Sequence, residues 1–98
     1  MIKVAIERIL APGMEQTYYQ VLRKAKFEAS GVTGYINSEV LRNHENPNHW
    51  LLLISWESLA DWSAWERSET RRRLLAEISV MLEQPESITV YEPGFVKV

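Results

Sequence analysis

The 98-residue chain contains no cysteine. Disulfide frameworks, thiolate nucleophiles and cysteine-ligated zinc or iron–sulfur centres are therefore excluded. The chain also lacks a long apolar run, since a signal peptide needs about 7–15 consecutive apolar residues and a membrane helix about 20. Its first residues, MIKVAIERIL, alternate apolar side chains with charged or small ones. We therefore expect a cytoplasmic protein that does not act at a membrane.

An excess of positive charge and the usual phosphate-binding loops are missing too. The formal net charge is -2, which leaves no basic surplus for nucleic acid or anionic lipid. There is no G-x-G-x-x-G or Walker loop, so dinucleotides and nucleoside triphosphates lack their phosphate cradle. No serine lies in a G-x-S-x-G elbow. The composition, 46% apolar and 24% charged, is ordinary for a globular domain.

The two histidines do not form a zinc motif. In HENPNH, residues 44–49, they stand one residue further apart than in H-E-x-x-H. Pro47 also prevents the helix which that motif requires. The segment is typical of a solvated loop, and we predict no metal site.

Hydrophobic patterning predicts the order strand, helix, strand, strand, helix, strand. Apolar residues alternate along the first strand, and they recur at helical spacing after Pro12-Gly13. The third strand is apolar at six of its first seven positions, as expected when both faces are covered. The expected strands are residues 2–10, 33–43, 50–57 and 87–92.

Small polar residues and a glycine predict the ends of the helices. Ser30-Gly31 closes the first helix, with Gly31 suited to a left-handed cap. Ser58 is placed to cap a short helix, with Asp61 three residues on as an imperfect capping box. Ser68 is placed to cap the helix that follows.

This order of elements is typical of the split βαβ, ferredoxin-like fold of the α+β class, here one domain over residues 1–98. It has an antiparallel four-stranded sheet with the helices on one face. The strands carry apolar residues on both faces, however. Leaving ~400 Å² of the uncovered face in water, at about 25 cal/mol per Å², forfeits on the order of 10 kcal/mol. We therefore predict a homodimer that packs sheet to sheet.

Three of the four tryptophans lie within residues 55–69, and we expect them to converge at one end of the layer between sheet and helices. Trp56 ends a strand, while Trp62 and Trp65 follow Leu59 along one side of the next helix. Such large aromatics are typical of a core, where each buries about 150–250 Å². The alternative is that they form a flat wall for a planar ligand.

Two strands and one helix carry polar residues of interest. Glu7 lies mid-strand, so it faces either water or a cavity, where burial would raise its pKa towards that of a general base. Asn37 and Glu39, expected in phase with Tyr35, raise the same question. Arg71 belongs to a run of three arginines at a helix start, where cations oppose the helix dipole. We expect one of the three to pair with an acid or to face an anionic ligand, unless the run is simply solvated.

Residues 34–75 resemble the antibiotic biosynthesis monooxygenase domain. The resemblance rests on Gly34-Tyr35 before a strand, on the Glu45-Asn46-Pro47 loop, on the apolar strand ending at Trp56, on the aromatic helix, and on Ser68 opening the next one. It implies a dimeric αβ barrel in which each protomer keeps a pocket between its sheet and its helices. Some members of this family oxidise aromatic polyketides or quinols with dioxygen and no cofactor. Others bind and degrade haem, and others have no known activity.

Two departures from the family's patterns bear on its activity here. Trp65 matches a tryptophan of the haem-degrading members, but Glu7 and Leu75 stand where those have asparagine and histidine. Without that imidazole there is no evident iron ligand, so haem degradation is disfavoured. Trp56 matches a tryptophan of the polyketide-oxidising members, but Leu52 replaces an asparagine and Trp62 falls near the position of a tyrosine.

The resemblance therefore implies a cofactor-independent monooxygenase that acts with dioxygen on a small aromatic, polyketide or quinol-like substrate. The alternative is a non-catalytic dimeric module that binds a planar ligand, including haem held without degradation. In either case we expect no nucleic-acid partner. The expected catalytic residues are Glu7, Asn37 and Trp65, and the expected substrate contacts are Tyr35, Trp56, Trp62 and Arg71.

Overall fold

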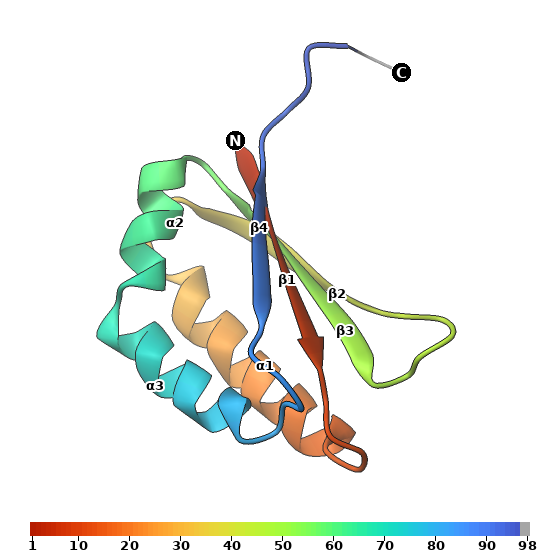
Figure 1. Ribbon diagram of the computed structural model, residues 1–98. Coiled ribbons are helices and arrows are strands. Elements are labelled where there is room, and N and C mark those ends of the chain that lie inside the picture. The colour runs from red at the N-terminus through yellow and green to blue at the C-terminus, as the bar shows by residue number, and fades with distance from the viewer. Residues whose placement is uncertain (97–98) are drawn as a thin grey trace.

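The computed structural model describes residues 1–96 (Figure 1). The last two positions of the predicted domain lie outside the described residues. The predicted order of elements is confirmed, including the short helix after Ser58 and the further helix after Ser68. The elements are β1 (Ile2–Ile9), α1 (Glu15–Ser30), β2 (Tyr35–Arg42), β3 (His49–Trp56), α2 (Leu59–Glu66), α3 (Glu69–Ser79) and β4 (Ser87–Tyr91).

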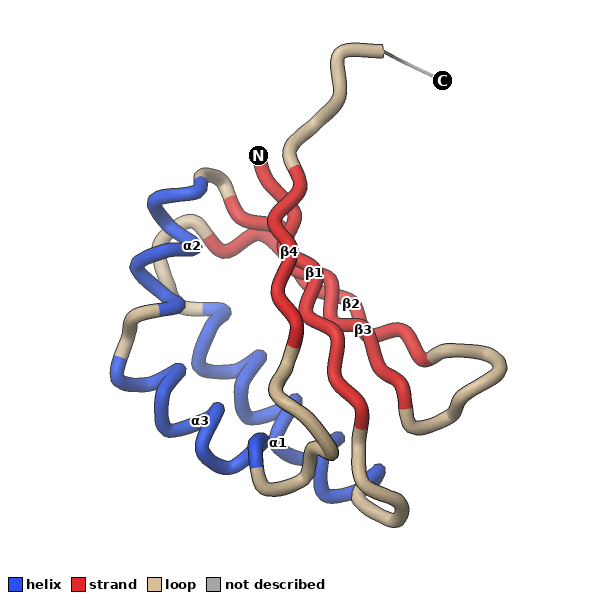
Figure 2. Tube along the Cα trace, in the orientation of Figure 1, coloured by secondary structure: helices blue, strands red, loops and turns tan. Residues whose placement is uncertain are grey.

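The four strands form one antiparallel sheet in the order β2-β3-β1-β4. The helices α1, α2 and α3 all lie on the same face of this sheet, and its other face is open (Figure 1, Figure 2). This is the split βαβ arrangement, so the predicted ferredoxin-like α+β fold is confirmed.

Alternation along the strands gives the sheet an inner face, toward the helices, and an outer face. Val4 and Ile6 of β1 and Ile54 of β3 are buried on the inner face. Ala5, between Val4 and Ile6, pairs with Leu53 on the outer face. Both faces of the central strands are therefore apolar, as the sequence pattern indicates.

β2 contains a bulge that the sequence pattern does not reveal. Tyr35 pairs with Trp56, whereas Asn37 pairs with the neighbouring Ser55, so the register shifts by one residue between them. Such a shift turns the side chains that follow to the other face of the sheet. Tyr35 therefore faces the helices, while Asn37 and Glu39 stand at outward positions. The prediction that these three residues share a face is wrong.

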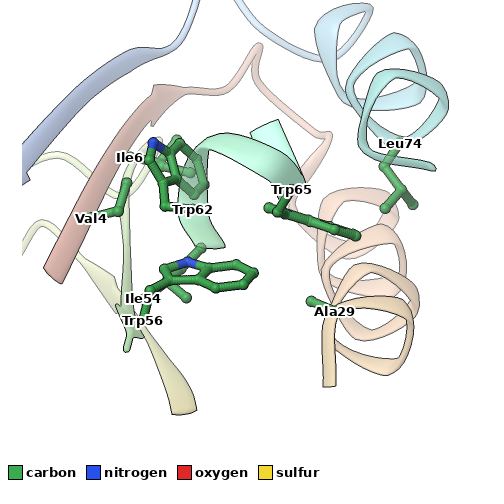
Figure 3. Packing of buried hydrophobic residues seen from close by; sticks show 8 residues of the cluster. All are labelled: Val4, Ile6, Ala29, Ile54, Trp56, Trp62, Trp65 and Leu74. Atoms are coloured by element: carbon green, nitrogen blue, oxygen red, sulfur yellow. The ribbon is translucent and has the colours of Figure 1, made fainter. Parts of the chain in front are cut away.

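Three tryptophans pack together at one end of the space between sheet and helices, as predicted (Figure 3). Trp56 is fully buried, and its ring centroid lies 6.1 Å from that of Trp62 and 6.3 Å from that of Trp65. Leu59, expected on the same side of α2, is instead 55% exposed. It is the first residue of that helix, ahead of the turns that the two tryptophans anchor.

Both predicted serine caps are present, and the predicted glycine cap is not. The hydroxyl of Ser58 accepts a hydrogen bond from the backbone N–H of Asp61, and Ser68 accepts one from Arg71, each at 3.1 Å. Gly31 has a φ of -93°, so a left-handed cap at this residue is wrong. The chain leaves α1 through a turn and takes up a positive φ only at Gly34, one residue before β2.

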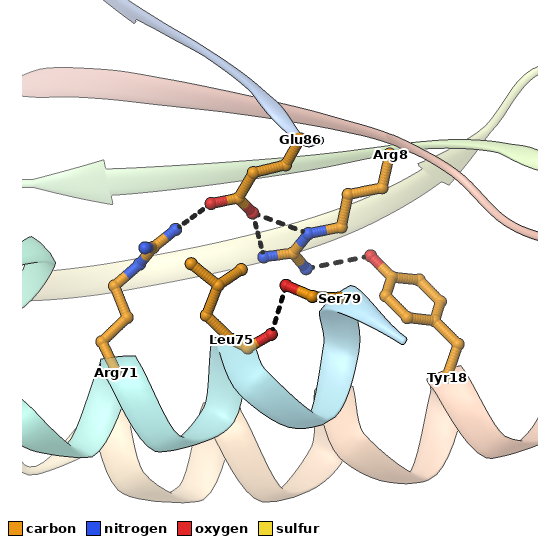
Figure 4. A network of polar contacts seen from close by, with 6 residues as sticks. All are labelled: Arg8, Tyr18, Arg71, Leu75, Ser79 and Glu86. Atoms are coloured by element: carbon orange, nitrogen blue, oxygen red, sulfur yellow. Dashed lines mark hydrogen bonds and ion pairs between the residues drawn. The ribbon is translucent and has the colours of Figure 1, made fainter. Parts of the chain in front are cut away.

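A buried polar network ties the loop before β4 to the rest of the layer (Figure 4). Arg8 of β1 donates two hydrogen bonds to Oε1 of Glu86, at 3.0 and 2.8 Å, and a third to the hydroxyl of Tyr18 at 3.1 Å. Arg71 of α3 donates from Nη2 to Oε2 of Glu86 at 2.7 Å. One carboxylate thus joins a strand, a helix and a loop far apart in the sequence.

The arginines also determine the ionisation of Glu86. Burial alone would raise the pKa of this carboxyl group, but the charge and hydrogen bonds of Arg8 and Arg71 outweigh burial and hold the pKa below its ordinary value. The stabilisation is therefore present above the ordinary carboxyl pKa and is lost as the pH falls through the lowered one.

Gly34→Ala should destabilise the fold. The φ of 87° at Gly34 costs other residues of order 1–3 kcal/mol, and a Cβ there would collide with the side chain of Asp61. Urea unfolding would measure the loss. Gly31→Ala is the matched control, because its φ is negative and its Cβ would meet nothing within 4 Å. We expect that control to change stability by less than about 0.5 kcal/mol, and equal losses in the two variants would contradict this account.

Glu86→Gln should lower the free energy of unfolding by about 3–5 kcal/mol, because it leaves two buried guanidinium groups without their counter-ion. The control is Glu77→Gln, which breaks the exposed ion pair with Lys24 and should cost at most about 1 kcal/mol. Urea unfolding from neutral pH down to pH 3 would show the gap between wild type and Glu86→Gln narrowing as the acid protonates. A gap that stays constant would contradict the assigned role of the carboxylate.

Candidate functional site

A cavity of about 390 Å³ lies between the inner face of the sheet and the helices. This volume falls within the range of about 300–1,000 Å³ that small-molecule sites occupy. Its exposed lining residues belong to α1 and to the edge strand β2, which places its opening between these two elements. The residues that line it are Ile6, Arg8, Tyr19, Leu22, Arg23, Ala25, Lys26, Ala29, Tyr35, Ser38, Glu39, Val40, Leu52, Ile54, Trp65, Arg71, Leu74, Leu75 and Ile78.

Besides the exposed Tyr19, two aromatic side chains form part of the wall. Trp65, on α2, is buried and reaches the cavity from the helical side, while Tyr35 reaches it from β2. The hydroxyl of Tyr35 lies 2.8 Å from that of Ser38, which also lines the cavity. The wall therefore offers flat apolar surface together with a pair of hydroxyl groups.

Trp56 and Trp62 stand behind this wall and are not among the lining residues. The ring of Trp56 packs edge-on against that of Tyr35, with 5.7 Å between the ring centroids. It also packs against the ring of Trp65 in a tilted arrangement, with 6.3 Å between the centroids. The ring of Trp62 lies 5.6 Å from Cζ of Arg71. Both tryptophans therefore position residues that line the cavity.

The cavity has a cationic side formed by Arg8 and Arg71. Both arginines belong to the buried network around Glu86, and the side chain of Leu75 lies between them beneath that carboxylate (Figure 4). The pairing of Arg71 with an acid is one of the outcomes expected from its place at the start of a helix. Burial raises the pKa of the nearby Tyr18 hydroxyl, and the charge of Arg8 offsets this only in part. Tyr18 is therefore a neutral member of the network.

The structure does not bring Glu7 and Asn37 together with Trp65. Glu7 is half-exposed on the outer face, where its carboxylate lies 3.2 Å from Nε2 of His49. Asn37 borders a polar hollow on the same outer face, next to Lys3. Within this chain the sheet separates both residues from the cavity.

Sequence reasoning missed Arg8, Tyr18 and Glu86. A signal for Arg8 exists, because it continues the alternation of the buried Val4 and Ile6. A charged residue at the next inner position of a strand predicts a buried ion pair. Glu86 carries no comparable signal, since it lies in a loop and meets its partners only through the fold.

Residues 1–96 contain neither a cluster of metal-ligating side chains nor a helix that could span a membrane. No group of three or more histidine, aspartate or glutamate side chains there is arranged to hold a metal ion. None of the helices in that range is long and apolar enough to cross a membrane.

The chain is similar to several known proteins. It is 33% identical to the Bacillus subtilis protein YczJ over 61 residues, which cover 62% of this chain and 64% of YczJ. It is 28% identical over 68 residues to the 42.8 kDa protein in the whiE locus of Streptomyces coelicolor, covering 69% of this chain but only 17% of that protein. A crystal structure of a conserved protein from Methanosarcina mazei Go1 matches with a TM-score of 0.88 at 20% identity, over 95% of this chain and 92% of the other.

The fold thus recurs in proteins with little sequence identity to this one. The sequence pattern of one family, described as antibiotic biosynthesis monooxygenase, matches residues 1–77. This span includes β1 to α2, α3 except its last two residues, and every lining residue of the cavity except Ile78. The chain belongs to the antibiotic biosynthesis monooxygenase family.

Proposed function

We propose that the protein is a monooxygenase that uses dioxygen, without a bound cofactor, to oxidise a small electron-rich aromatic, polyketide or quinol-like molecule. The observation that supports this proposal is the cavity of about 390 Å³ between sheet and helices. Trp65 and Tyr35 offer a planar ring surface for stacking there. Membership of the family supports the type of reaction.

The chemistry needs little from the protein beyond binding and exclusion of water. A phenol or anthrone that loses a proton becomes an anion electron-rich enough to pass one electron to dioxygen. Recombination of the two radicals forms a carbon–oxygen bond, and loss of water then leaves a carbonyl group. In total, one methylene carbon and one dioxygen give one carbonyl and one water. A dry, shaped cavity holds the ring in place and protects the reactive intermediates.

The proton leaves to solvent in this scheme, because the inner part of the cavity presents no carboxylate as a base. Glu39 is the single acidic residue among those that line the cavity, and it stands at an outward position on the edge strand. That Glu7 or Asn37 acts as the general base stays a prediction. Either residue could do so only if the substrate bound at the outer face of the sheet.

Trp65→Phe should lower turnover by up to about tenfold, because a smaller ring forfeits about 0.5–1.5 kcal/mol of stacking. Oxygen uptake on a panel of hydroquinones and anthrones would measure the effect. Trp50→Phe is the matched control, since Trp50 belongs to the border of the second apolar cluster and does not line the cavity.

The same assay distinguishes a reaction in the cavity, beside Trp65, from a reaction at the outer face, beside Glu7. Loss of turnover in Glu7→Gln with full turnover in Trp65→Phe would move the reaction to the outer face and contradict the proposal. Binding of the rings without any oxygen uptake would favour the non-catalytic alternative.

We also propose that a second copy of the chain covers the outer face. Ala5, Leu51 and Leu53 occupy its centre and Leu41, which is 45% exposed, extends it along β2. Polar groups such as Lys3 and Glu7 border this apolar surface. A second copy that packs sheet against sheet removes this apolar centre from water. The cavity of each copy then lies on the inner face of its own sheet, away from the interface.

Leu53→Glu should convert the dimer into a monomer, because it places a charge at the centre of the proposed interface. Light scattering at micromolar concentration would report the mass, which we expect to be twice 11.4 kDa in the wild type. Leu59→Glu makes the same chemical change on α2, away from the interface, and should leave the dimer intact. A wild-type protein that is monomeric at this concentration would contradict the proposal.

A further inference from the structure

The buried network beside the cavity carries more positive than negative charge. Arg8 and Arg71 each bear a guanidinium group that stays protonated at physiological pH. Glu86 is the one carboxylate that pairs with them among the described residues. Both arginines are more than nine-tenths buried. Two guanidinium groups and one carboxylate leave the network with one excess positive charge. A buried charge without a counter-ion is costly, so a second anion bound here would be stabilising.

Arg71 is placed to bind this second anion. Of its five N–H groups it donates one to Glu86, and its guanidinium makes no other hydrogen bond within residues 1–96. The side chain lines the cavity. Glu86 accepts a hydrogen bond from Nη2 of this guanidinium, and Cζ lies 5.6 Å from the centroid of the Trp62 ring. A planar fork held in this way is preorganised for a charged oxygen.

The cavity mouth favours the same sign of ligand. Arg23 and Lys26 of α1 are exposed and line the cavity, whereas Glu39 is the single acidic lining residue and belongs to the outward register of β2. A cleft bordered by one sign of charge attracts ions of the other sign. Aromatic walls and cationic groups therefore act on one ligand.

We infer that the ligand of the cavity is a planar aromatic anion and that Arg71 binds its charged oxygen. This inference names the substrate class of the proposed site and rests on its use as the substrate-binding cavity. The ring lies against Trp65 and the charged oxygen meets the free N–H groups of Arg71. A carboxylate and an ionised ring hydroxyl present the same chemistry to a guanidinium, so separate probes must distinguish them.

The test measures binding in the absence of oxygen, by calorimetry or by quenching of tryptophan fluorescence. The probes are 2-naphthoate, its neutral isostere 2-naphthamide, and 2-naphthol, whose ionisation is visible in its absorbance. We expect either 2-naphthoate to bind at least about tenfold more tightly than 2-naphthamide, or 2-naphthol to bind as its anion at neutral pH, since hydrogen bonds to charged groups contribute about 1.5–3 kcal/mol. The first result identifies a carboxylate as the charged group and the second an ionised hydroxyl.

Arg71→Gln should abolish the preference for the anion, while Arg72→Gln, an identical change at the exposed neighbouring position on α3, should preserve it. Arg71→Lys keeps the charge but loses the planar fork, so we expect an intermediate loss. Unfolding measurements on each variant check that the fold is retained. If Arg71→Gln fails to fold, the wild-type comparison of charged and neutral probes decides the matter alone.

Equal binding of 2-naphthoate and 2-naphthamide, together with neutral binding of 2-naphthol, would overturn the inference. Equal effects of Arg71→Gln and Arg72→Gln would also overturn it. Because no oxygen is present, these outcomes are independent of turnover. Oxidation of a neutral substrate at a rate that Arg71→Gln does not change would contradict this inference and support the monooxygenase proposal. Tight anion binding without oxygen uptake would support this inference and contradict the monooxygenase proposal.

Discussion

The helices α1, α2 and α3 all pack against the same face of the sheet, and this one-sided packing determines where the other features lie (Figure 1). The space between the layers must be filled from both ends. The tryptophan cluster around Trp56 occupies one end, and a second cluster around Tyr18 and Leu10 occupies the other. The cavity lies between these clusters, since residues of both line it. No helix packs against the outer face, which is why we propose that a second copy of the chain covers its leucines.

The network around Glu86 connects packing with chemistry. A single carboxylate accepts hydrogen bonds from both Arg8 and Arg71 inside the layer, where an unpaired cation would cost more to bury. The same geometry leaves one guanidinium with unused donors at the wall of the cavity. The ion-pair network around Glu86 therefore stabilises the loop before β4 and also makes one side of the cavity positively charged.

Structure that depends on neighbouring residues, such as a helix cap, can be predicted from the sequence. Contacts between residues far apart in the sequence cannot be predicted from such local patterns. Ser58 and Ser68 cap helices through neighbours three residues away, so a short stretch contains all the information. The bulge between Tyr35 and Asn37 depends on pairing with β3, which no pattern within β2 can report. Glu86 is separated by 78 positions from Arg8, so its role follows only from the assembled fold. Hence the sequence predicts the tryptophan cluster and a contact role for Arg71, but it does not predict that Arg8 joins Arg71 through Glu86.

The central claim is that the cavity between sheet and helices binds an aromatic anion through Arg71. A crystal structure of the protein with 2-naphthoate bound tests it most directly. The account predicts the naphthalene ring against Trp65, with its carboxylate within hydrogen-bond distance of the Arg71 guanidinium. A ligand bound on the outer face beside Glu7, or one inside the cavity with its carboxylate turned away from Arg71, would contradict it.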